Sequence, residues 1–152
     1  MSIEKLPGGT RGARMPPRLV AKLLVPVLER LHRRRGDRFG DMDVLYLHTV
    51  GARSGEPRTS PVARMDDGRG GVLVVASYGG AQQHPGWYHN VVAHPDQVSV
   101  EYGGRTRHVT VRQLAGDERA AAWKHITTVQ PRFAEYETKT DRELPVLRLI
   151  PD

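Results

Sequence analysis

Short strand-forming segments separated by glycine turns place the tightest constraint on the fold of this chain. Gln97 to Tyr102 and Arg105 to Leu114 alternate in polarity and are joined by Gly103-Gly104, which is typical of a β-hairpin. Val72 to Ser77 is a continuous apolar run and predicts a buried strand. Three more strands are predicted at Val44 to Val50, Arg58 to Met65 and Pro145 to Ile150. Six strands with few helices between them favour a mainly antiparallel barrel over a doubly wound parallel sheet.

Helical patterns flank these strands. Between Leu19 and Leu31 apolar residues recur at helical spacing opposite basic residues, which predicts a basic amphipathic helix over 18–36 that Pro26 would kink. Shorter helices are predicted over Pro85 to Ala93, Asp117 to Val129 and Pro131 to Lys139. Residues 1–17, rich in glycine and proline, are expected to form a flexible arm. The expected organisation is therefore an arm, the helix 18–36 and one barrel domain over 42–152.

Composition excludes several classes of site. The 152 residues are enough for one domain with a sizeable core. The absence of cysteine rules out disulfides, thiolate catalysis and cysteine-bound metals. No run approaches the roughly 18 apolar residues of a membrane span, and the N-terminus lacks the apolar core of a signal peptide. We therefore expect a soluble cytoplasmic protein.

Positive charge is concentrated at the N-terminal end. The net charge is +6, and residues 1–40 hold ten Lys/Arg against three Asp/Glu. Such a segment attracts anionic surfaces. The helix 18–36 could pack on the barrel, contact an anionic membrane surface through 18–35, or touch nucleic acid. No nucleic acid is expected, because the chain has no recognition-helix motif and no aromatic–basic repeat.

A glycine turn between two arginines is the first candidate binding feature. Arg53 and Arg58 flank Ser54-Gly55. Guanidinium groups bind phosphate and carboxylate bidentately, and the exposed amides of a glycine turn add affinity for anions. The alternative is a solvated hairpin tip with no ligand. The segment is not a P-loop, because Gly-x-x-x-x-Gly-Lys-Ser/Thr is absent.

A second glycine turn and an aromatic pair follow. In Ser77-Tyr78-Gly79-Gly80 the glycines would let a flat ring approach the backbone, although an ordinary strand-to-helix turn has the same composition. Trp87 and Asn90 are three residues apart and share a helix face, which suits ring stacking with a polar contact. The alternative is a core tryptophan and a capping asparagine. Tyr136 could orient an acceptor or relay a proton, or be a half-buried structural residue.

Histidines do not indicate a metal site. His84, His89 and His94 are spaced by five, which turns successive side chains about 140° apart on a helix. Helical metal ligands are usually three or four residues apart. We therefore expect no metal. The Gly-x-Ser-x-Gly pattern of hydrolases is also absent.

Taken in order, the segments resemble the deazaflavin (F420)-dependent nitroreductase and quinone reductase family, small split-barrel oxidoreductases. The matching segments are Leu47 to Pro61, Val74 to Ser77, Gly79 to Ala81, His84 to Asn90 and Tyr136 to Val146. The resemblance spans about residues 42–151. It implies an α+β, mainly β fold: a six-stranded antiparallel split β-barrel with short flanking helices and an N-terminal amphipathic helix.

The resemblance also implies a cofactor and a reaction. The protein would be an enzyme that passes a hydride from reduced coenzyme F420, known from actinobacteria and some archaea, to a quinone, nitro compound or similar electrophile. Arg53 and Arg58 would hold the phosphate and oligoglutamate tail. Ala76, Ser77 and Tyr78 would line the ring, with Trp87 and Asn90 beside it. Tyr136 and Ser77 would serve the reaction. The full expected coenzyme set is Arg53, Ser54, Gly55, Arg58, Thr59, Pro61, Ala76, Ser77, Tyr78, Gly79, Trp87 and Asn90.

The chain departs from the family pattern at four positions. Tyr78 stands where lysine is common, so one cation near the tail is missing. Gln130 and Phe133 replace tyrosines of members that reduce bulky nitroimidazoles, and Ala63 replaces an aromatic residue. Quinone reduction is therefore better supported than nitroimidazole reduction.

Other functions remain open from the sequence. The chain could be a non-catalytic deazaflavin carrier, an FMN-dependent enzyme on the same barrel, or a basic membrane-surface or nucleic-acid binder. FMN lacks the oligoglutamate tail, so charge distinguishes the two cofactors. The sequence is compatible with a monomer or a homodimer.

Overall fold

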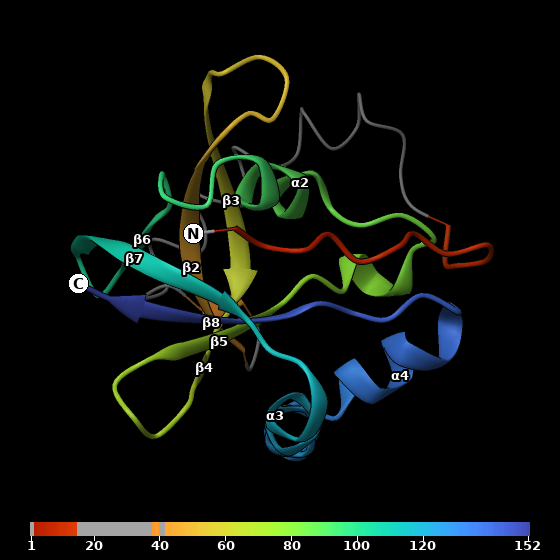
Figure 1. Cartoon of the computed structure of the whole chain (residues 1–152). Coiled ribbons are helices and arrows are strands. Elements are labelled where there is room, and N and C mark those ends of the chain that lie inside the picture. The colour runs from red at the N-terminus through yellow and green to blue at the C-terminus, as the bar shows by residue number, and fades with distance from the viewer. Residues whose placement is uncertain (1, 15–37, 40–41) are drawn as a thin grey trace.

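The computed structural model describes residues 2–14, 38–39 and 42–152 (Figure 1). The basic helix expected over 18–36 lies outside the described residues and stays a prediction.

An antiparallel sheet forms the body of the protein (Figure 1). The strands are β1 (Arg38–Phe39), β2 (Met42–Val50), β3 (Pro57–Ala63), β4 (Met65–Asp66), β5 (Val72–Val75), β6 (Ser99–Tyr102), β7 (Arg105–Gln113) and β8 (Val146–Pro151). Their order is β1-β2-β6-β7-β8-β5-β4, with β3 also paired to β2. Each of the six predicted strands is present. The strand count of six is wrong, because the described residues form eight: Arg58 to Met65 is divided into β3 and β4, and β1 adds a short pairing.

The sheet curls because two strand segments change partners along their length. The first half of β7 pairs with β6, whereas its second half, from Val109 to Gln113, pairs with β8. The chain also passes from β3 to β4 through Arg64, whose guanidinium donates to the carbonyl oxygen of Val44 at 3.2 Å. No ladder joins β3 to β5 among the described strands. The result is a split-barrel-like fold that stays open at this point.

The β6–β7 turn confirms the hairpin that was predicted from its two glycines. Gly103 and Gly104 have φ values of +62° and +74°. A two-residue turn with both residues at positive φ matches the right-handed twist of the strands it joins. Glycine adopts this conformation without the steric cost that other residues would carry.

Helices cover the barrel at both ends. They are the short 3-10 helix η1 (Tyr78–Gly80) and the α-helices α2 (Gly86–Ala93), α3 (Gly116–Val129) and α4 (Arg132–Lys139). The three predicted α-helices after residue 42 are confirmed. Asp117, the residue at which the sequence predicted this helix to begin, lies in the first turn of α3, which begins one residue earlier, at Gly116. There its negative charge is favourable beside the helix N-terminus.

Two apolar clusters stabilise this arrangement. The larger lies inside the barrel, where Leu45, Val74 and Leu147 are fully buried and α2 adds Tyr88 and Val91. The smaller lies under α3 and α4 and includes Ile126, Phe133 and Leu144. Each buried side chain of this size contributes roughly 1.5–3 kcal/mol. The second cluster fixes α4, and α4 carries Tyr136.

Residues 2–14, called here the N-terminal strap, are not a free arm. The Leu6 amide donates to the Tyr88 hydroxyl at 3.1 Å, and the Gln113 side chain donates to the carbonyl oxygen of Glu4 at 2.8 Å. Ala13 forms a bridge with Ala81. Gly12 allows this approach, because a Cβ there would lie 2.0 Å from the Gln82 amide nitrogen. The strap therefore lies along α2 and η1 (Figure 1).

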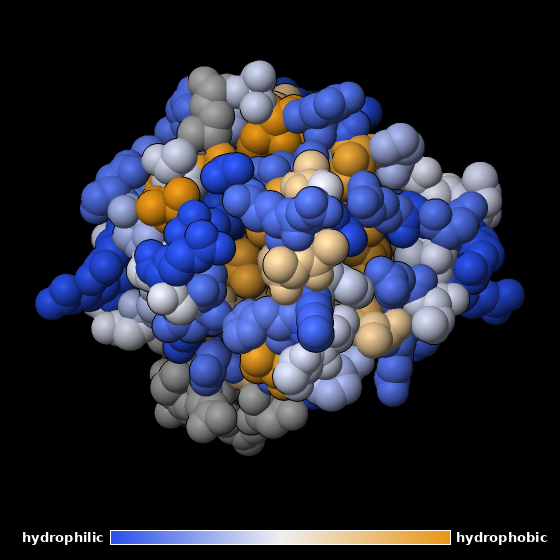
Figure 2. All heavy atoms as spheres, turned by 60° about the horizontal axis from the view of Figure 1, so that its bottom comes forward, coloured by the Kyte–Doolittle hydropathy of each residue, from blue (hydrophilic) through white to orange (hydrophobic). Residues whose placement is uncertain are grey.

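The face of the molecule shown in Figure 2 is mostly hydrophilic. Among the described residues, only Tyr78 and Val129 are large hydrophobic side chains that are exposed. No described helix has the length and apolar character needed to cross a membrane.

Candidate active site

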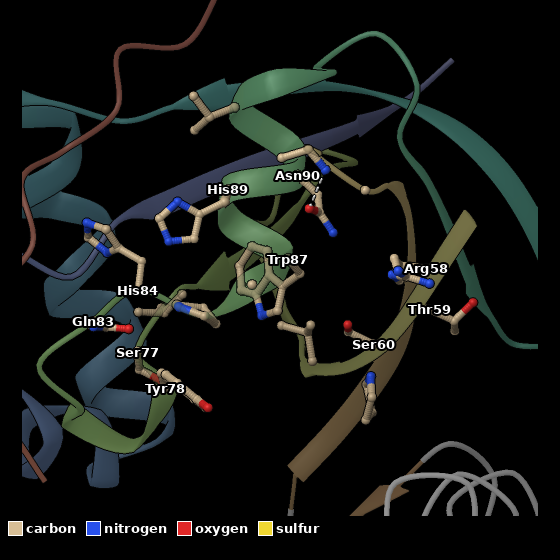
Figure 3. A pocket seen from close by; sticks show the side chains of 18 of the residues that line it. Arg58, Thr59, Ser60, Ser77, Tyr78, Gln83, His84, Trp87, His89 and Asn90 are labelled. Atoms are coloured by element: carbon tan, nitrogen blue, oxygen red, sulfur yellow. Dashed lines mark hydrogen bonds between the residues drawn. The ribbon is translucent and has the colours of Figure 1, made fainter. Parts of the chain in front are cut away.

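A large pocket opens between β3, the 77–79 turn and α2 (Figure 3). Its volume is about 1240 Å³, somewhat above the roughly 300–1,000 Å³ that is usual for small-molecule and cofactor sites. Arg58, Thr59 and Ser60 lie on one side, and Ser77 and Tyr78 lie across from them. The Trp87 side chain projects from α2 between these two walls. The space is large enough for a cofactor and a second molecule.

One end of the pocket is cationic. Lys5, Arg53 and Arg58 line it, and no aspartate or glutamate does so among the described residues. Burial, with the charges of Lys5 and Arg53, lowers the pKa of His89, which also lines the pocket. The pocket therefore favours an anionic ligand.

The first arginine loop is held open by its own backbone and by α2. Gly55, at φ +69°, donates its amide to the carbonyl oxygen of Gly51 at 3.0 Å. Asn90 accepts a hydrogen bond from the Ala52 amide at 2.9 Å, and its amide nitrogen donates to the Thr49 hydroxyl at 3.2 Å (Figure 3). Asn90 therefore ties the arginine loop to the helix that carries Trp87, a structural contact that its spacing from Trp87 did not predict.

The second turn has an unusual backbone. Ser77 is in the right-handed helical region, whereas Tyr78 and Gly79 have φ values of +46° and +63°. Tyr78 is the only non-glycine residue at positive φ among those described. Consecutive right- and left-handed residues direct successive N–H groups toward one concave site, an arrangement that binds anions. The strained backbone thus lies where the pocket needs hydrogen-bond donors.

A buried arginine lies behind this turn. Arg142 is 5% exposed. Its guanidinium donates to the carbonyl oxygens of Ala76 at 3.0 Å, Ser77 at 2.6 Å and Ala81 at 2.8 Å. It also contacts Nδ1 of His84 at 3.1 Å. Arg142 was assigned no role from the sequence. Its place in the matching segment from Tyr136 to Val146 was the only signal, and nothing in the residue type showed that it was buried.

His84 joins Arg142 to the N-terminal strap. Its Nε2 lies 2.9 Å from the carbonyl oxygen of Leu6, which requires an Nε2–H donor, so Nδ1 is free to accept from Arg142. Burial, together with the charge of Arg142, lowers the pKa of His84. A neutral ring with one defined tautomer therefore fits both contacts. His84 was considered as a metal ligand from the sequence, but in the structure it links Arg142 to the strap by hydrogen bonds.

This neutral histidine should make stability depend on pH. Its folded-state pKa is lowered, so the unfolded chain takes up the proton first as pH falls below the ordinary value of 6.5. The stability contribution is complete above pH 6.5 and is lost as pH falls from there toward the folded-state pKa. Urea unfolding from pH 8 to pH 5 should therefore show a steeper loss for the wild type than for His84→Gln. The difference between the two proteins is the relevant quantity, because the raised pKa of His108 acts in the opposite direction in both. Parallel curves would contradict the assignment.

The other end of the pocket is apolar and aromatic. Phe133 and Tyr136 of α4 line it with Val62 and Ala63 of β3. The rings of Phe133 and Tyr136 meet edge to face at 5.7 Å between centroids. Two of the positions that depart from the family pattern, Ala63 and Phe133, thus shape this end, whereas Gln130 is not among the described lining residues.

Most of the residues predicted for the site come together in this pocket. The lining includes Arg53, Ser54, Arg58, Thr59, Pro61, Ser77, Tyr78, Gly79, Trp87, Asn90 and Tyr136. Gly55 and Ala76 are not part of it: Gly55 shapes the arginine loop, and Ala76 is fully buried behind the turn. Lys5 was missed because the strap was expected to be free, and His89 was missed because it was considered only as a metal ligand. No group of three or more potential metal ligands occurs among the described residues.

Fold and pocket together define a split-barrel-like protein with one cationic and one apolar end to its main cavity. Comparison with known proteins narrows this class. The family model described as F420H(2)-dependent quinone reductase matches residues 21–151. The F420H(2)-dependent quinone reductase Rv1261c of Mycobacterium tuberculosis is 37% identical over 108 residues, which cover 69% of this chain and 71% of the relative. The chain belongs to the F420H(2)-dependent quinone reductase family.

Solved structures agree with this assignment. A structure titled as an F420-H2-dependent reductase, FDR-A, is 42% identical with a TM-score of 0.62, covering 70% of this chain and 92% of its own. Another, described as a domain-swapped dimer, is 36% identical with a TM-score of 0.64, covering 86% of this chain and 98% of its own.

Proposed function

We propose that this protein transfers a hydride from reduced coenzyme F420 to a quinone, with the coenzyme tail at the cationic end of the pocket. The observation that carries this proposal is the charge of the lining: Lys5, Arg53 and Arg58 face the cavity without a described carboxylate. A phosphate and several glutamates suit such a wall, because guanidinium groups bind both in a bidentate manner. When bound, the reduced deazaflavin supplies the hydride, and the protein supplies orientation and electrostatics.

The rest of the lining has separate tasks in this proposal. The N–H groups of Ser77, Tyr78 and Gly79 hold the polar edge of the ring, and the Ser77 hydroxyl adds a donor. Trp87 bounds the ring from α2. The apolar end near Phe133 and Ala63 holds the acceptor and excludes water. Tyr136 donates a hydrogen bond to the acceptor oxygen on which negative charge develops.

A titration tests the coenzyme assignment directly. The protein has two tryptophans, and Trp87 lines the pocket while Trp123 packs under Arg119 on α3. A Trp123→Phe protein therefore reports the pocket through Trp87 alone. Oxidised F420 should quench its fluorescence with a micromolar Kd, whereas FMN, with one phosphate and no glutamates, should bind much more weakly. Tight FMN binding with no response to F420 would place the chain with the FMN-dependent enzymes instead.

Replacing Tyr136 with phenylalanine should separate turnover from coenzyme binding. The hydroxyl makes no hydrogen bond to the described residues, and the ring keeps its contact with Phe133 in the variant. General acid assistance typically contributes 10²–10⁴-fold, so we expect kcat with a quinone to fall at least about 10-fold while the Kd for F420 is unchanged. Single-turnover oxidation of reduced F420 measures this. Unchanged turnover would remove Tyr136 from the reaction and leave it as packing.

Assembly and location follow as further proposals. A homodimer is consistent with the relative described as a domain-swapped dimer, and the hydrogen bonds of the strap are of a kind that two copies can exchange. Light scattering over a range of concentrations distinguishes monomer from dimer. Contact of residues 18–35 with the cytoplasmic face of a membrane stays a prediction, and flotation with anionic vesicles tests it.

A further inference from the structure

We propose that Arg142 is a positioning residue for coenzyme binding: it holds the 76–81 backbone so that the N–H groups of residues 77–79 face the pocket, and the charge of Arg142 keeps that wall positive. This inference rests on the function proposed above. Arg142 does not itself line the pocket in the described structure. It acts through the carbonyl groups of Ala76, Ser77 and Ala81.

The hydrogen bonds fix the direction of the turn. A peptide group has its carbonyl and its N–H on opposite sides, so holding the carbonyl oxygens of Ala76 and Ser77 on the guanidinium turns the next N–H groups, those of Ser77 and Tyr78, the other way. In the described part of the chain, the hydrogen bonds within this turn use the N–H groups of Gly80 and Ala81. Those of Ser77, Tyr78 and Gly79 are not used within it. These three residues line the pocket, so their donors are available to a ligand.

The charge of Arg142 is unusual for a buried group. Among the described residues, its partners are carbonyl oxygens and an imidazole nitrogen, and none is a carboxylate. The acidic residues on either side have other partners: Asp141 binds the Thr10 and Arg11 amides, and Glu143 pairs with Arg119. Burying a guanidinium without a counter-ion is costly. The three carbonyl groups and His84 accept hydrogen bonds from it, but one net positive charge remains directly behind the pocket wall, where it favours negative charge on a bound ring.

His84 explains how the guanidinium is kept in place. Its Nδ1 accepts from Arg142, and its Nε2–H binds the strap. Thr140 adds a contact to the amide of Arg142 at 3.2 Å, and its hydroxyl donates to the Arg11 carbonyl oxygen at 2.8 Å. The strap, the turn and the segment before β8 therefore meet at one buried guanidinium. An arginine that only stabilised the fold would make the same contacts. The test must therefore measure binding of the deazaflavin ring separately from the stability of the protein.

The experiment compares two ligands on matched variants. Arg142→Lys keeps the charge but loses the planar fork, and Arg142→Gln loses both. Each is titrated with F420 and with the deazaflavin fragment that carries the ribityl chain but neither phosphate nor glutamates, in the Trp123→Phe background. Because Arg142 acts at the ring, we expect Arg142→Lys to weaken both ligands by the same factor, about tenfold, and Arg142→Gln to weaken them further. Arg58→Ala should weaken only the full coenzyme. Arg148→Lys is the control, because Arg148 is a half-buried arginine that pairs with Asp67 outside this pocket. This variant should bind both ligands like the wild type.

A spectroscopic measurement separates positioning from stability. At saturating coenzyme, the absorbance shift of the bound deazaflavin should be reduced in Arg142→Gln and kept in Arg148→Lys. A residue that only stabilises the fold would lower the melting temperature and leave this shift intact. If the Arg142 variants do not fold, His84→Leu is used in their place, because it removes one acceptor of the guanidinium. It should lower the affinity for both ligands by the same factor.

The outcomes are distinct. If the wild-type protein binds neither ligand, the proposed function fails before Arg142 is tested. If the wild type binds and the folded variants bind the fragment normally with an unchanged absorbance shift, the proposal for Arg142 is overturned while the coenzyme assignment stands.

Discussion

Replacement of both Arg53 and Arg58 by alanine is expected to weaken F420 binding about 100-fold and to leave the fold intact. The expected loss follows from two charge-assisted contacts of roughly 1.5 kcal/mol each. Stability should hardly change, because the Arg58 side chain is 53% exposed and its pair with Glu56, at 3.8 Å, is an exposed one. Exposed ion pairs contribute about 0–1 kcal/mol. Arg58 can therefore leave Glu56 for a ligand at little cost.

The matched control is Arg105→Ala/Arg107→Ala. These exposed arginines of β7 lie outside the pocket lining, and their replacement changes the net charge by the same amount. The control should bind F420 like the wild type, apart from a small loss of long-range attraction. Repeating the titrations at increasing salt adds a second criterion, because screening weakens the wild-type complex more than that of the pocket variant. Equal losses for the two double variants would show that overall charge, not the arginine loop, attracts the coenzyme.

The order of strands and turns could be predicted because each depends on local chemistry. The alternation in Arg105 to Leu114 and the glycine pair before it specify a hairpin, and the structure has β6 and β7 joined there. The division of Arg58 to Met65 into two strands could not be predicted in this way. It depends on where the chain changes partners, from β2 at Ala63 to β5 at Met65. Both partners are neighbouring strands along the chain, so the residue types alone fit one continuous strand as well as two, and the way the sheet closes sets the point of change.

The sequence predicted the site residues whose exposed functional groups can contact a ligand directly. It did not predict those that are buried and act by holding other parts of the site in place. Arg53, Arg58 and Tyr136 carry groups whose uses follow from their type, and the pocket brings all three together. Asn90 has an equally suggestive type, yet its amide is engaged by Ala52 and Thr49. Arg142 and His84 were assigned no role because their importance lies in long-range contacts with backbone carbonyl groups, such as the one between His84 and Leu6. Such contacts leave no trace in local spacing.

Residues 2–14 show the same limit for a whole segment. The glycines and prolines of residues 1–17 predicted a flexible arm, since such residues are frequent in mobile termini. In the structure the absence of a side chain at Gly12 permits close backbone packing on Gln82. A glycine allows the chain to be flexible, and it also allows another segment of the backbone to pack closely against it. Which of the two occurs depends on whether such a segment is present. Here the partner is the 80–84 segment, which leads from η1 into α2.

Gly80→Ala is expected to be the most disruptive single substitution in the site. Gly80 has a φ of +81°, and a Cβ there would lie 2.6 Å from the carbonyl oxygen of Tyr136 and 3.0 Å from Cβ of Lys139. The left-handed backbone alone costs an alanine roughly 1 kcal/mol. Because the closest neighbour is backbone of α4, relief requires a shift of the helix, so a total of about 3 kcal/mol is expected. The displaced helix carries Phe133 and Tyr136, and quinone turnover should fall with the stability.

The appropriate comparison is Gly70→Ala. Gly70 has a φ of +83°, but a Cβ there would have no neighbour within 4 Å, so this variant carries the backbone cost without the collision. Urea unfolding should show a loss of about 1 kcal/mol for Gly70→Ala and about 3 kcal/mol for Gly80→Ala, the difference being the contact with α4. Turnover should be normal in the first and strongly reduced in the folded fraction of the second. Equal losses of stability in both proteins would mean that α4 can shift without an energetic cost. Tyr136 would then be held over the pocket too loosely to orient an acceptor.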